Sequence, residues 1–274
     1  MKAKKQKLTE RLLDLGACAT EKEAAARIMA GEVYINGQLA RNGALVKAED
    51  AVTLKDVLPY ASKGGFKLAS ALEDFHIDVE GRVCVDAGAS TGGFTDCLIQ
   101  RGAGLVYAVD VGFGQLMGKL RQDERVVNLE KTNISDEKLL SLSPRPDLGT
   151  VDVSYLSLRK AVPYFAAILH GTGELCCLVK PLFEIDDAEA RRTGVIPEAG
   201  YAPLLRSLID DIDAMPGAAV RAVTHSPVTG NAGTREFFLH VALGEACPPI
   251  PDEEIACAVR RAAGLERYKK ATKA

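Results

Sequence analysis

Four charged residues stand beside apolar segments that are predicted to be strands. Lys67 precedes the first strand of a region in which strands alternate with helices, and Asp152 ends the fourth strand. Lys180 follows the fifth strand, and Glu236 begins the last one. Because strand ends converge on the ligand site in this kind of fold, we expect two lysines and two carboxylates to share one cleft.

Each of these residues also has a simpler interpretation. A lysine at a strand end is usually solvated, and an aspartate after a strand often caps the next helix. Together, however, they suit the removal of a proton from a weak nucleophile such as a ribose 2′-hydroxyl. A lysine can act as the base when burial and a second cation lower its pKa. We therefore assign Lys180 as the base, with Asp152 and Glu236 orienting it and Lys67 tuning its charge.

A glycine-rich turn, DAGASTGG (86–93), follows the first strand. Glycine lets a backbone approach a ligand closely, and amides at the start of a helix can bind it. The G-x-x-x-G-G spacing is neither the G-x-G-x-x-G of nicotinamide enzymes nor a P-loop. A pyrophosphate site would avoid a carboxylate at the position of Asp86, whereas S-adenosylmethionine has no phosphate and its ammonium can use nearby acids. This compound is therefore the predicted cofactor.

A second acid supports the same interpretation. Asp110 ends the second strand, where it is placed to hydrogen-bond ribose hydroxyls. The alternative is an ordinary glycine turn in an α/β protein. The occurrence of both acids with the glycines, in the expected strand context, favours a cofactor site.

The elements that would position these residues follow from short apolar segments. The predicted strands cover residues 83–85, 105–109, 126–129, 150–153, 174–179, 220–224 and 236–243. Helices are expected between them, including those at 94–100 and 157–170. This alternation predicts a doubly wound, mostly parallel sheet of seven strands with helices on both faces, a Rossmann-like α/β fold.

A different pattern precedes this region. Thr20 and Glu23 form a capping box at the start of a helix, and Asn36-Gly37 between extended segments predicts a hairpin. The expected elements are helices at 8–15 and 21–30 and strands at 33–35, 38–39 and 51–54. They predict a small α+β unit that is only marginally stable alone.

The overall charge argues against one class of protein, the strongly basic nucleic-acid binders. The net charge is −3, so the molecule as a whole is not a basic nucleic-acid binder, but both ends are rich in lysine and arginine. Such ends suit local contact with phosphate or simply aid solubility.

The cysteine pattern indicates the cellular compartment in which the protein functions. The seven cysteines show no metal-ligand spacing, and Cys84, Cys176 and Cys177 are expected to be buried small hydrophobes. We predict no metal site, no disulfides and a cytoplasmic location. No segment has the pattern of a signal peptide or a membrane span.

Six stretches together match the motifs of one family. They are SKGGFKL (62–68), DAGASTGGFTDCL (86–98), AVDVGFGQL (108–116), DVSYLSL (152–158), LVKPLFE (178–184) and GTREFFL (233–239). The sequence resembles the TlyA family of ribosomal RNA 2′-O-methyltransferases, whose catalytic half resembles the FtsJ methyltransferases. In addition, AAARIMAGEVYINGQ (24–38) is similar to the S4 RNA-binding module.

The resemblance implies a set of functional residues. The family's catalytic tetrad falls on the same four residues, Lys67, Asp152, Lys180 and Glu236. Its S-adenosylmethionine site maps to Asp86, Gly88, Ser90, Thr91, Gly92, Gly93, Phe94, Asp110, Asn133 and Asp152, with Asn133 near the adenine. The residues expected to contact RNA are Lys7, Arg11, Lys22, Arg27 and Lys63.

The resemblance also implies partners and domains. The expected partner is ribosomal RNA or a ribosomal subunit, methylated at a cytidine ribose by a monomer or weak dimer. The domains are an S4-like RNA-binding domain at 6–58, a linker with a first helix carrying Lys67 at 59–80, the methyltransferase domain at 81–248, and a basic C-terminal helix or tail at 249–274.

Two other functions compete with this interpretation. A non-enzymatic RNA-binding or ribosome-assembly factor could keep the fold, but it would have no reason to keep the four charged residues. A membrane-lytic protein is suggested by the haemolysin label of some family members. No spanning segment or long basic amphipathic helix supports it.

Overall fold

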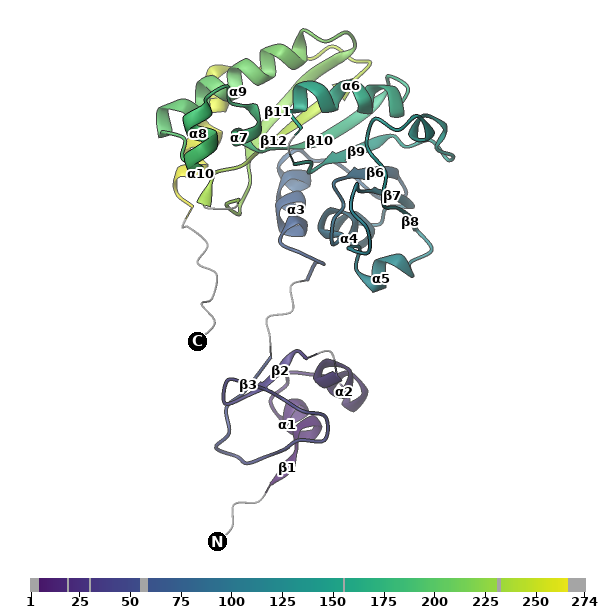
Figure 1. Cartoon of the computed structure of the whole chain (residues 1–274), viewed down its shortest axis with the longest axis vertical. Coiled ribbons are helices and arrows are strands. Elements are labelled where there is room, and N and C mark those ends of the chain that lie inside the picture. The colour runs from purple at the N-terminus through teal and green to yellow at the C-terminus, as the bar shows by residue number, and fades with distance from the viewer. Residues whose placement is uncertain are drawn as a thin grey trace. The chain divides into compact units, whose positions relative to one another are not determined.

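The computed structural model describes residues 5–18, 20–29, 31–54, 59–154, 156–230 and 233–265. The chain divides into two compact units, Met1–Pro59 and Tyr60–Ala274 (Figure 1). Within the described ranges, no helix has the length and apolar character needed to cross a membrane.

The smaller unit contains two helices and short antiparallel strands. They are β1 (Gln6–Lys7), α1 (Leu8–Asp14), α2 (Glu21–Met29), β2 (Val33–Ile35), β3 (Gln38–Leu39), β4 (Leu45–Val46) and β5 (Val52–Leu54). The predicted helices and hairpin are confirmed, and Asn36 and Gly37 form the turn with φ of 49° and 79°. The sequence did not predict β1 and β4, which pair with each other. Two-residue strands have too little alternation to detect, and β1 and β4 lack the Asn-Gly turn that indicated β3. Leu8, Leu12 and Val33 lie in the core.

The larger unit is built on a seven-stranded sheet. Its strands are β6 (Val83–Ala87), β7 (Leu105–Val109), β8 (Val126–Leu129), β9 (Leu148–Val151), β10 (Gly173–Val179), β11 (Ala218–His225) and β12 (Phe237–Leu243). The order is β11-β12-β10-β9-β6-β7-β8. All neighbouring pairs are parallel except those of β12, which runs antiparallel to β10 and β11. The predicted mostly parallel sheet is confirmed.

Helices cover both faces of this sheet, as Figure 1 shows. They are α3 (Gly64–Asp74), α4 (Gly93–Gln100), α5 (Gly118–Arg121), the 3-10 helix η1 (Glu137–Ser141), α6 (Leu158–Ile168), α7 (Pro181–Glu184), α8 (Ala188–Thr193), α9 (Glu198–Asp213) and α10 (Asp252–Ala263). The adjacent residues Phe237 and Phe238 are both fully buried, but on opposite sides of the sheet. Phe237 packs with Phe165 of α6, and Phe238 packs with Leu68 of α3.

Some predicted boundaries change by a residue or two. The fourth strand ends at Val151, so Asp152 is the first residue after it, and Glu236 lies just before β12. Their backbones still hydrogen-bond to neighbouring segments, Asp152 N–H to the carbonyl of Ala87 and the carbonyl of Glu236 to Ser226 N–H. At the C-terminal end, α10 has an acidic first turn and the basic residues Arg260 and Arg261 in its last turn, an order that suits the helix dipole. The more distal basic residues, Arg267, Lys269, Lys270 and Lys273, lie outside the described residues.

A partly buried acid joins four strands at the end of the sheet where β10 begins. Glu174 accepts hydrogen bonds from Arg82 and, at 2.6 Å, from His240 Nε2, and it lies 3.7 Å from Arg221. These partners come from the segments of β6, β12 and β11. The hydrogen bond from His240, reinforced by Arg82, lowers the pKa of Glu174 to about 2 although burial opposes the change.

We expect Glu174→Gln to lower the free energy of unfolding by about 2–3 kcal/mol near neutral pH, because charge-assisted hydrogen bonds are lost. The folded-state pKa of about 2 lies below the ordinary 4.5. The carboxylate's contribution is therefore full above the ordinary pKa and is lost as the pH falls toward about 2. Urea unfolding of both proteins should show their stability difference shrinking below the ordinary pKa. An unchanged difference would contradict this account.

Candidate active site

A cavity of about 1020 Å³ lies at the carboxyl ends of β6, β9 and β10. The start of α3 and the segment before β12 complete its wall. Doubly wound sheets bind ligands at this edge. All four residues of the predicted tetrad line the cavity, namely Lys67, Asp152, Lys180 and Glu236.

The tetrad forms two ion pairs. Lys180 Nζ lies 2.6 Å from Asp152 Oδ1 and donates to Ser154 Oγ at 3.1 Å. Lys67 Nζ lies 2.5 Å from Glu236 Oε2. The structure thus agrees with Asp152 as the residue that orients Lys180, but Glu236 contacts Lys67 directly instead of Lys180.

Glu236 is the more buried of the two acids. Its side chain is 7% exposed, against 24% for Asp152. Burial raises the pKa of Glu236 above its ordinary value, and the charge of Asp152 adds to this, whereas Lys67 and Lys180 act in the opposite direction. All four charges therefore act on one another within a single electrostatic cluster.

Small residues allow α3 to start at the edge of the cavity. A Cβ added to Gly65 would collide with the ring of Tyr60, and one added to Gly93 would collide with Ser62 Oγ. These close approaches set the first turn of α3 against the start of α4. Lys67 is the fourth residue of α3, and its amine donates a hydrogen bond to Glu236.

The glycine loop packs directly against the segment that carries Asp152. Gly88 has a φ of +86°, and a Cβ there would collide with the backbone carbonyl of Asp152. Only glycine allows both the conformation and the approach. Further along the loop, the backbone N–H of Ser90 donates to Asp110 Oδ2 at 2.8 Å. The ends of β6, β7 and β9 are thereby joined around the cavity floor.

Asp86 is not part of the cavity wall, and its predicted contact with the cofactor's ammonium stays a prediction. Its side chain is fully buried and accepts hydrogen bonds from Thr95 Oγ1 at 2.6 Å and Thr150 Oγ1 at 2.9 Å. Burial raises its pKa to about 7, although both threonine hydroxyls oppose this. Through these two hydrogen bonds, Asp86 anchors the start of the glycine loop to α4 and β9.

The other predicted cofactor residues divide into two groups. Gly88, Ser90, Thr91, Gly93, Phe94 and Asp152 line the cavity, whereas Gly92, Asp110 and Asn133 are not part of its wall. Both oxygens of Asp110 accept backbone N–H groups, from Ser90 and from Gly112. Asn133 is exposed and its Oδ1 accepts from Ser135. A direct role of Asp110 and Asn133 in cofactor binding thus remains a prediction.

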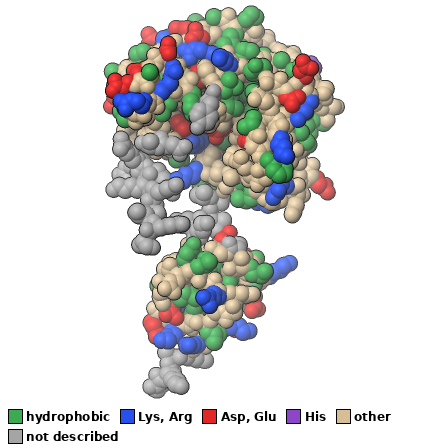
Figure 2. All heavy atoms as spheres, in the orientation of Figure 1, with side chains coloured by type: hydrophobic (Ala, Val, Ile, Leu, Met, Phe, Trp, Pro, Cys, Tyr) green, Lys and Arg blue, Asp and Glu red, His purple; other side chains and the backbone are tan. Residues whose placement is uncertain are grey.

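The predicted RNA contacts fall in both units. Lys63 lines the cavity, immediately before α3. In the smaller unit, Lys7 and Lys22 are exposed, Arg11 donates to the carbonyl of Ala48 at 3.2 Å, and Arg27 pairs with Glu23 at 3.0 Å. On the visible face of this unit in Figure 2, basic side chains are interspersed with acidic and apolar ones.

Sequence reasoning did not single out several residues of the site. Ser154 binds Lys180, and Leu182 and Phe183 line the cavity beside it. These residues lie inside the stretches DVSYLSL and LVKPLFE, so their proximity to tetrad residues was the available signal. The segment 228–230, by contrast, lines the cavity without any distinctive sequence pattern.

The fold and site together define the class. A Rossmann-like sheet with an antiparallel strand between β10 and β11 carries a glycine loop at its carboxyl edge, and acids and lysines gather beside that loop. The protein is thus a methyltransferase that depends on S-adenosylmethionine.

Comparisons with known proteins identify the family. The model of the FtsJ-like methyltransferases matches residues 60–243. YqxC of Bacillus subtilis, provisionally named an rRNA methyltransferase, is 37% identical and is aligned over 99% of both chains. The 16S/23S rRNA (cytidine-2′-O)-methyltransferase TlyA of Mycobacterium tuberculosis is 36% identical over 86% of this chain and 90% of its own. The chain therefore belongs to the FtsJ-like methyltransferase family, among its TlyA members.

A solved structure agrees with this assignment. A Streptococcus thermophilus protein, provisionally named a hemolysin, has a TM-score of 0.69 and 34% identity. The match covers 94% of this chain and 96% of the other. Hemolysin A of Brachyspira hyodysenteriae is also similar, at 35% identity over 85% of this chain and 98% of its own.

The residues present fit S-adenosylmethionine. Gly88 and Gly93 leave a backbone cradle at the cavity floor that a Cβ at either position would fill. The cavity volume also suits a small-molecule site. The loop Gly88–Phe94 would hold the cofactor by its backbone.

We expect Gly88→Ala to raise the dissociation constant for S-adenosylmethionine by about tenfold or more, which corresponds to about 1.4 kcal/mol. The new methyl group would displace Asp152 and the loop. Isothermal titration calorimetry would measure the change. Gly81→Ala is a matched control, because Gly81 also has a positive φ of 69° but no atom within 4 Å of the added Cβ. Equal affinities for both variants would refute the steric explanation.

Proposed function

We propose that this protein transfers the methyl group of S-adenosylmethionine to a ribose 2′-hydroxyl of ribosomal RNA. The observation that carries the proposal is the pair of lysine–carboxylate contacts, Lys180–Asp152 and Lys67–Glu236, in the wall of the cofactor cavity. The name of the Mycobacterium tuberculosis relative, which specifies cytidine in 16S and 23S rRNA, supports this acceptor. So does the name of the Campylobacter jejuni relative, which specifies cytidine in 23S rRNA.

In this proposal, Lys180 accepts the hydroxyl proton. Its amine is held by Asp152 and Ser154 at the cavity wall. When it is neutral, it can take a proton from an acceptor hydroxyl within hydrogen-bond reach. S-adenosylmethionine supplies an electrophilic methyl group on its sulfonium. Since this transfer is an in-line displacement, fixed positions of the acceptor and of Lys180 would account for much of the rate.

Lys67 and Glu236 have a supporting role in the same proposal. Their contact neutralises a largely buried carboxylate, since the side chains are 13% and 7% exposed. An unpaired charge in that position would be costly. The pair therefore adds no net charge to the cavity wall.

The smaller unit is proposed to be an S4-like RNA-binding domain spanning residues 6–58. Its exposed Lys7 and Lys22 are available to phosphate, whereas Arg27 is already paired with Glu23. Its cluster of basic residues is modest, which suits a module that adds contacts to a substrate held mainly elsewhere.

We expect Lys180→Ala to reduce methyl transfer to purified ribosomal subunits or rRNA by about 100- to 10,000-fold, the usual contribution of a general base. Affinity for S-adenosylmethionine should change little. Transfer of labelled methyl would be measured and the product mapped by its resistance to alkaline cleavage. Lys138→Ala is the matched control, because Lys138 is an exposed lysine of η1 outside the cavity. Cofactor binding without transfer to any rRNA by the unmodified protein would refute the proposed substrate.

We expect Lys22→Ala to weaken RNA binding and to reduce the slope of log affinity against log salt by about 0.7–0.9, the value for one phosphate contact. Arg27→Ala should have a smaller effect, since its guanidinium already binds Glu23. Filter binding over a series of salt concentrations would measure both. A slope unchanged by Lys22→Ala would remove that residue from the RNA contacts.

A further inference from the structure

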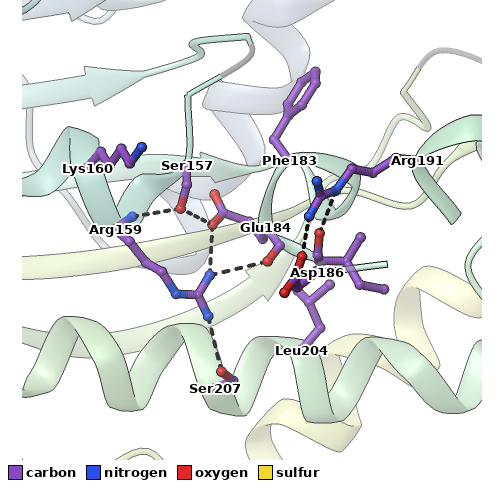
Figure 3. Close-up of a pocket in the computed structure, with 10 residues that line it drawn as sticks. Ser157, Arg159, Lys160, Phe183, Glu184, Asp186, Arg191, Leu204 and Ser207 are labelled. Carbon is purple, nitrogen blue, oxygen red and sulfur yellow. Dashed lines mark hydrogen bonds and ion pairs between the residues drawn. The ribbon is translucent and has the colours of Figure 1, made fainter. Parts of the chain in front are cut away.

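Glu184 is a buried carboxylate that the reaction does not use. It lines a second cavity, of about 450 Å³, on the other side of Phe183, which contributes to both cavities. Its side chain is 2% exposed. Figure 3 shows Glu184 beside Ser157 and Arg159, with dashed lines to both. A carboxylate with so little access to water requires internal donors.

Three donors surround this carboxylate, and all come from the start of α6. Glu184 accepts from Ser157 Oγ at 2.6 Å, from the backbone N–H of Leu158 at 2.8 Å and from Arg159 Nη1 at 3.1 Å. Ser157 is the N-cap of α6, and Leu158 is its first residue. A negative charge at this end of a helix is stabilised by the helix dipole and by otherwise unpaired N–H groups.

The same two segments also meet at the reacting end. Residues 152–158 follow β9 and residues 180–184 follow β10. At one end they are joined by Lys180 with Asp152 and Ser154, and at the other end by Glu184 with the start of α6. Only the three residues 181–183 separate Lys180 from Glu184, so a shift of Glu184 displaces the backbone of Lys180.

Arg159 connects this contact to the core. Its Nε lies 2.6 Å from Asp211 and its Nη2 donates to Ser207 Oγ at 3.1 Å, both on α9. Figure 3 shows the guanidinium spanning from Glu184 to that helix. Leu205 and Leu208 of α9 are fully buried. Arg159 therefore fixes the position of Glu184 relative to a helix of the core and not to a surface loop.

We propose that Glu184 is a positioning residue for proton transfer, which holds Lys180 against Asp152 and Ser154 by anchoring segment 180–184 to the start of α6. The inference rests on the proposed role of Lys180 as the base. Displacement of a reacting group by about 1 Å can reduce a rate by about 100-fold. A residue that touches neither substrate nor cofactor can thus control the rate through Lys180.

The variant that tests this is Glu184→Gln, which keeps the side-chain volume but replaces an acceptor oxygen with a donor. We expect the kcat for rRNA methylation to fall by about 10- to 100-fold, while the dissociation constant for S-adenosylmethionine stays within about twofold. A second readout is the acetylation rate of the Lys180 amine, followed over a pH series by mass spectrometry. We expect the pH dependence of this acetylation rate to differ between Glu184→Gln and the unmodified protein.

Asp186→Asn is the matched control. Asp186 lines the same cavity and bonds to Arg191, but its side chain is fully exposed. We expect kcat and the Lys180 acetylation profile of this variant to match those of the unmodified protein. If Glu184→Gln does not fold, Ser157→Ala takes its place, because it removes one of the three donors. We then expect a fall in kcat and a change in the Lys180 acetylation profile that are both smaller than those expected for Glu184→Gln.

The two readouts separate this inference from the proposed function. If the unmodified protein methylates rRNA and Glu184→Gln retains its kcat and its Lys180 acetylation profile, the positioning role is wrong. A fall in kcat that only follows a smaller folded fraction, with an unchanged acetylation profile, would also overturn it. If the unmodified protein methylates no rRNA, the proposed function fails, and the acetylation profile still decides whether Glu184 positions Lys180.

Discussion

The arrangement of the catalytic unit depends on one buried carboxylate. Asp86 has no exposed surface, and its oxygens accept hydrogen bonds from Thr95 on α4 and Thr150 on β9. Burying a carboxylate is costly unless donors are in place, and here its pKa rises to about 7. The end of β6 must therefore meet α4 and β9 in one geometry. That geometry sets Gly88 against the carbonyl of Asp152.

Ion pairs allow the cavity wall to carry charged side chains although it is partly buried. Lys180 pairs with Asp152 and Lys67 pairs with Glu236. Behind the cavity wall, Glu184 pairs with Arg159. An unpaired charge at any of these places would carry a large desolvation cost. The pairs also link segments that are distant in sequence, so they fix positions as well as charges.

The division of the chain into two units separates two tasks. The larger unit contains the glycine loop and all four tetrad residues, which line one cavity. The smaller unit is held by a core of its own that includes Leu8, Leu12 and Val33. Its proposed contribution is contact with RNA phosphate, which adds affinity and position without taking part in the chemistry.

The sequence by itself determined the fold class and which four charged residues share the cavity. Apolar segments of regular length predicted the sheet, and the charges beside them predicted which residues share the cavity, because these signals are local and periodic. Only the tertiary structure decided which lysine pairs with which acid, and that Asp86 faces inward to Thr95 and Thr150. The contact of Glu184 with α6 also emerged only there. Such choices depend on side-chain direction and on contacts between distant segments, which no local pattern specifies.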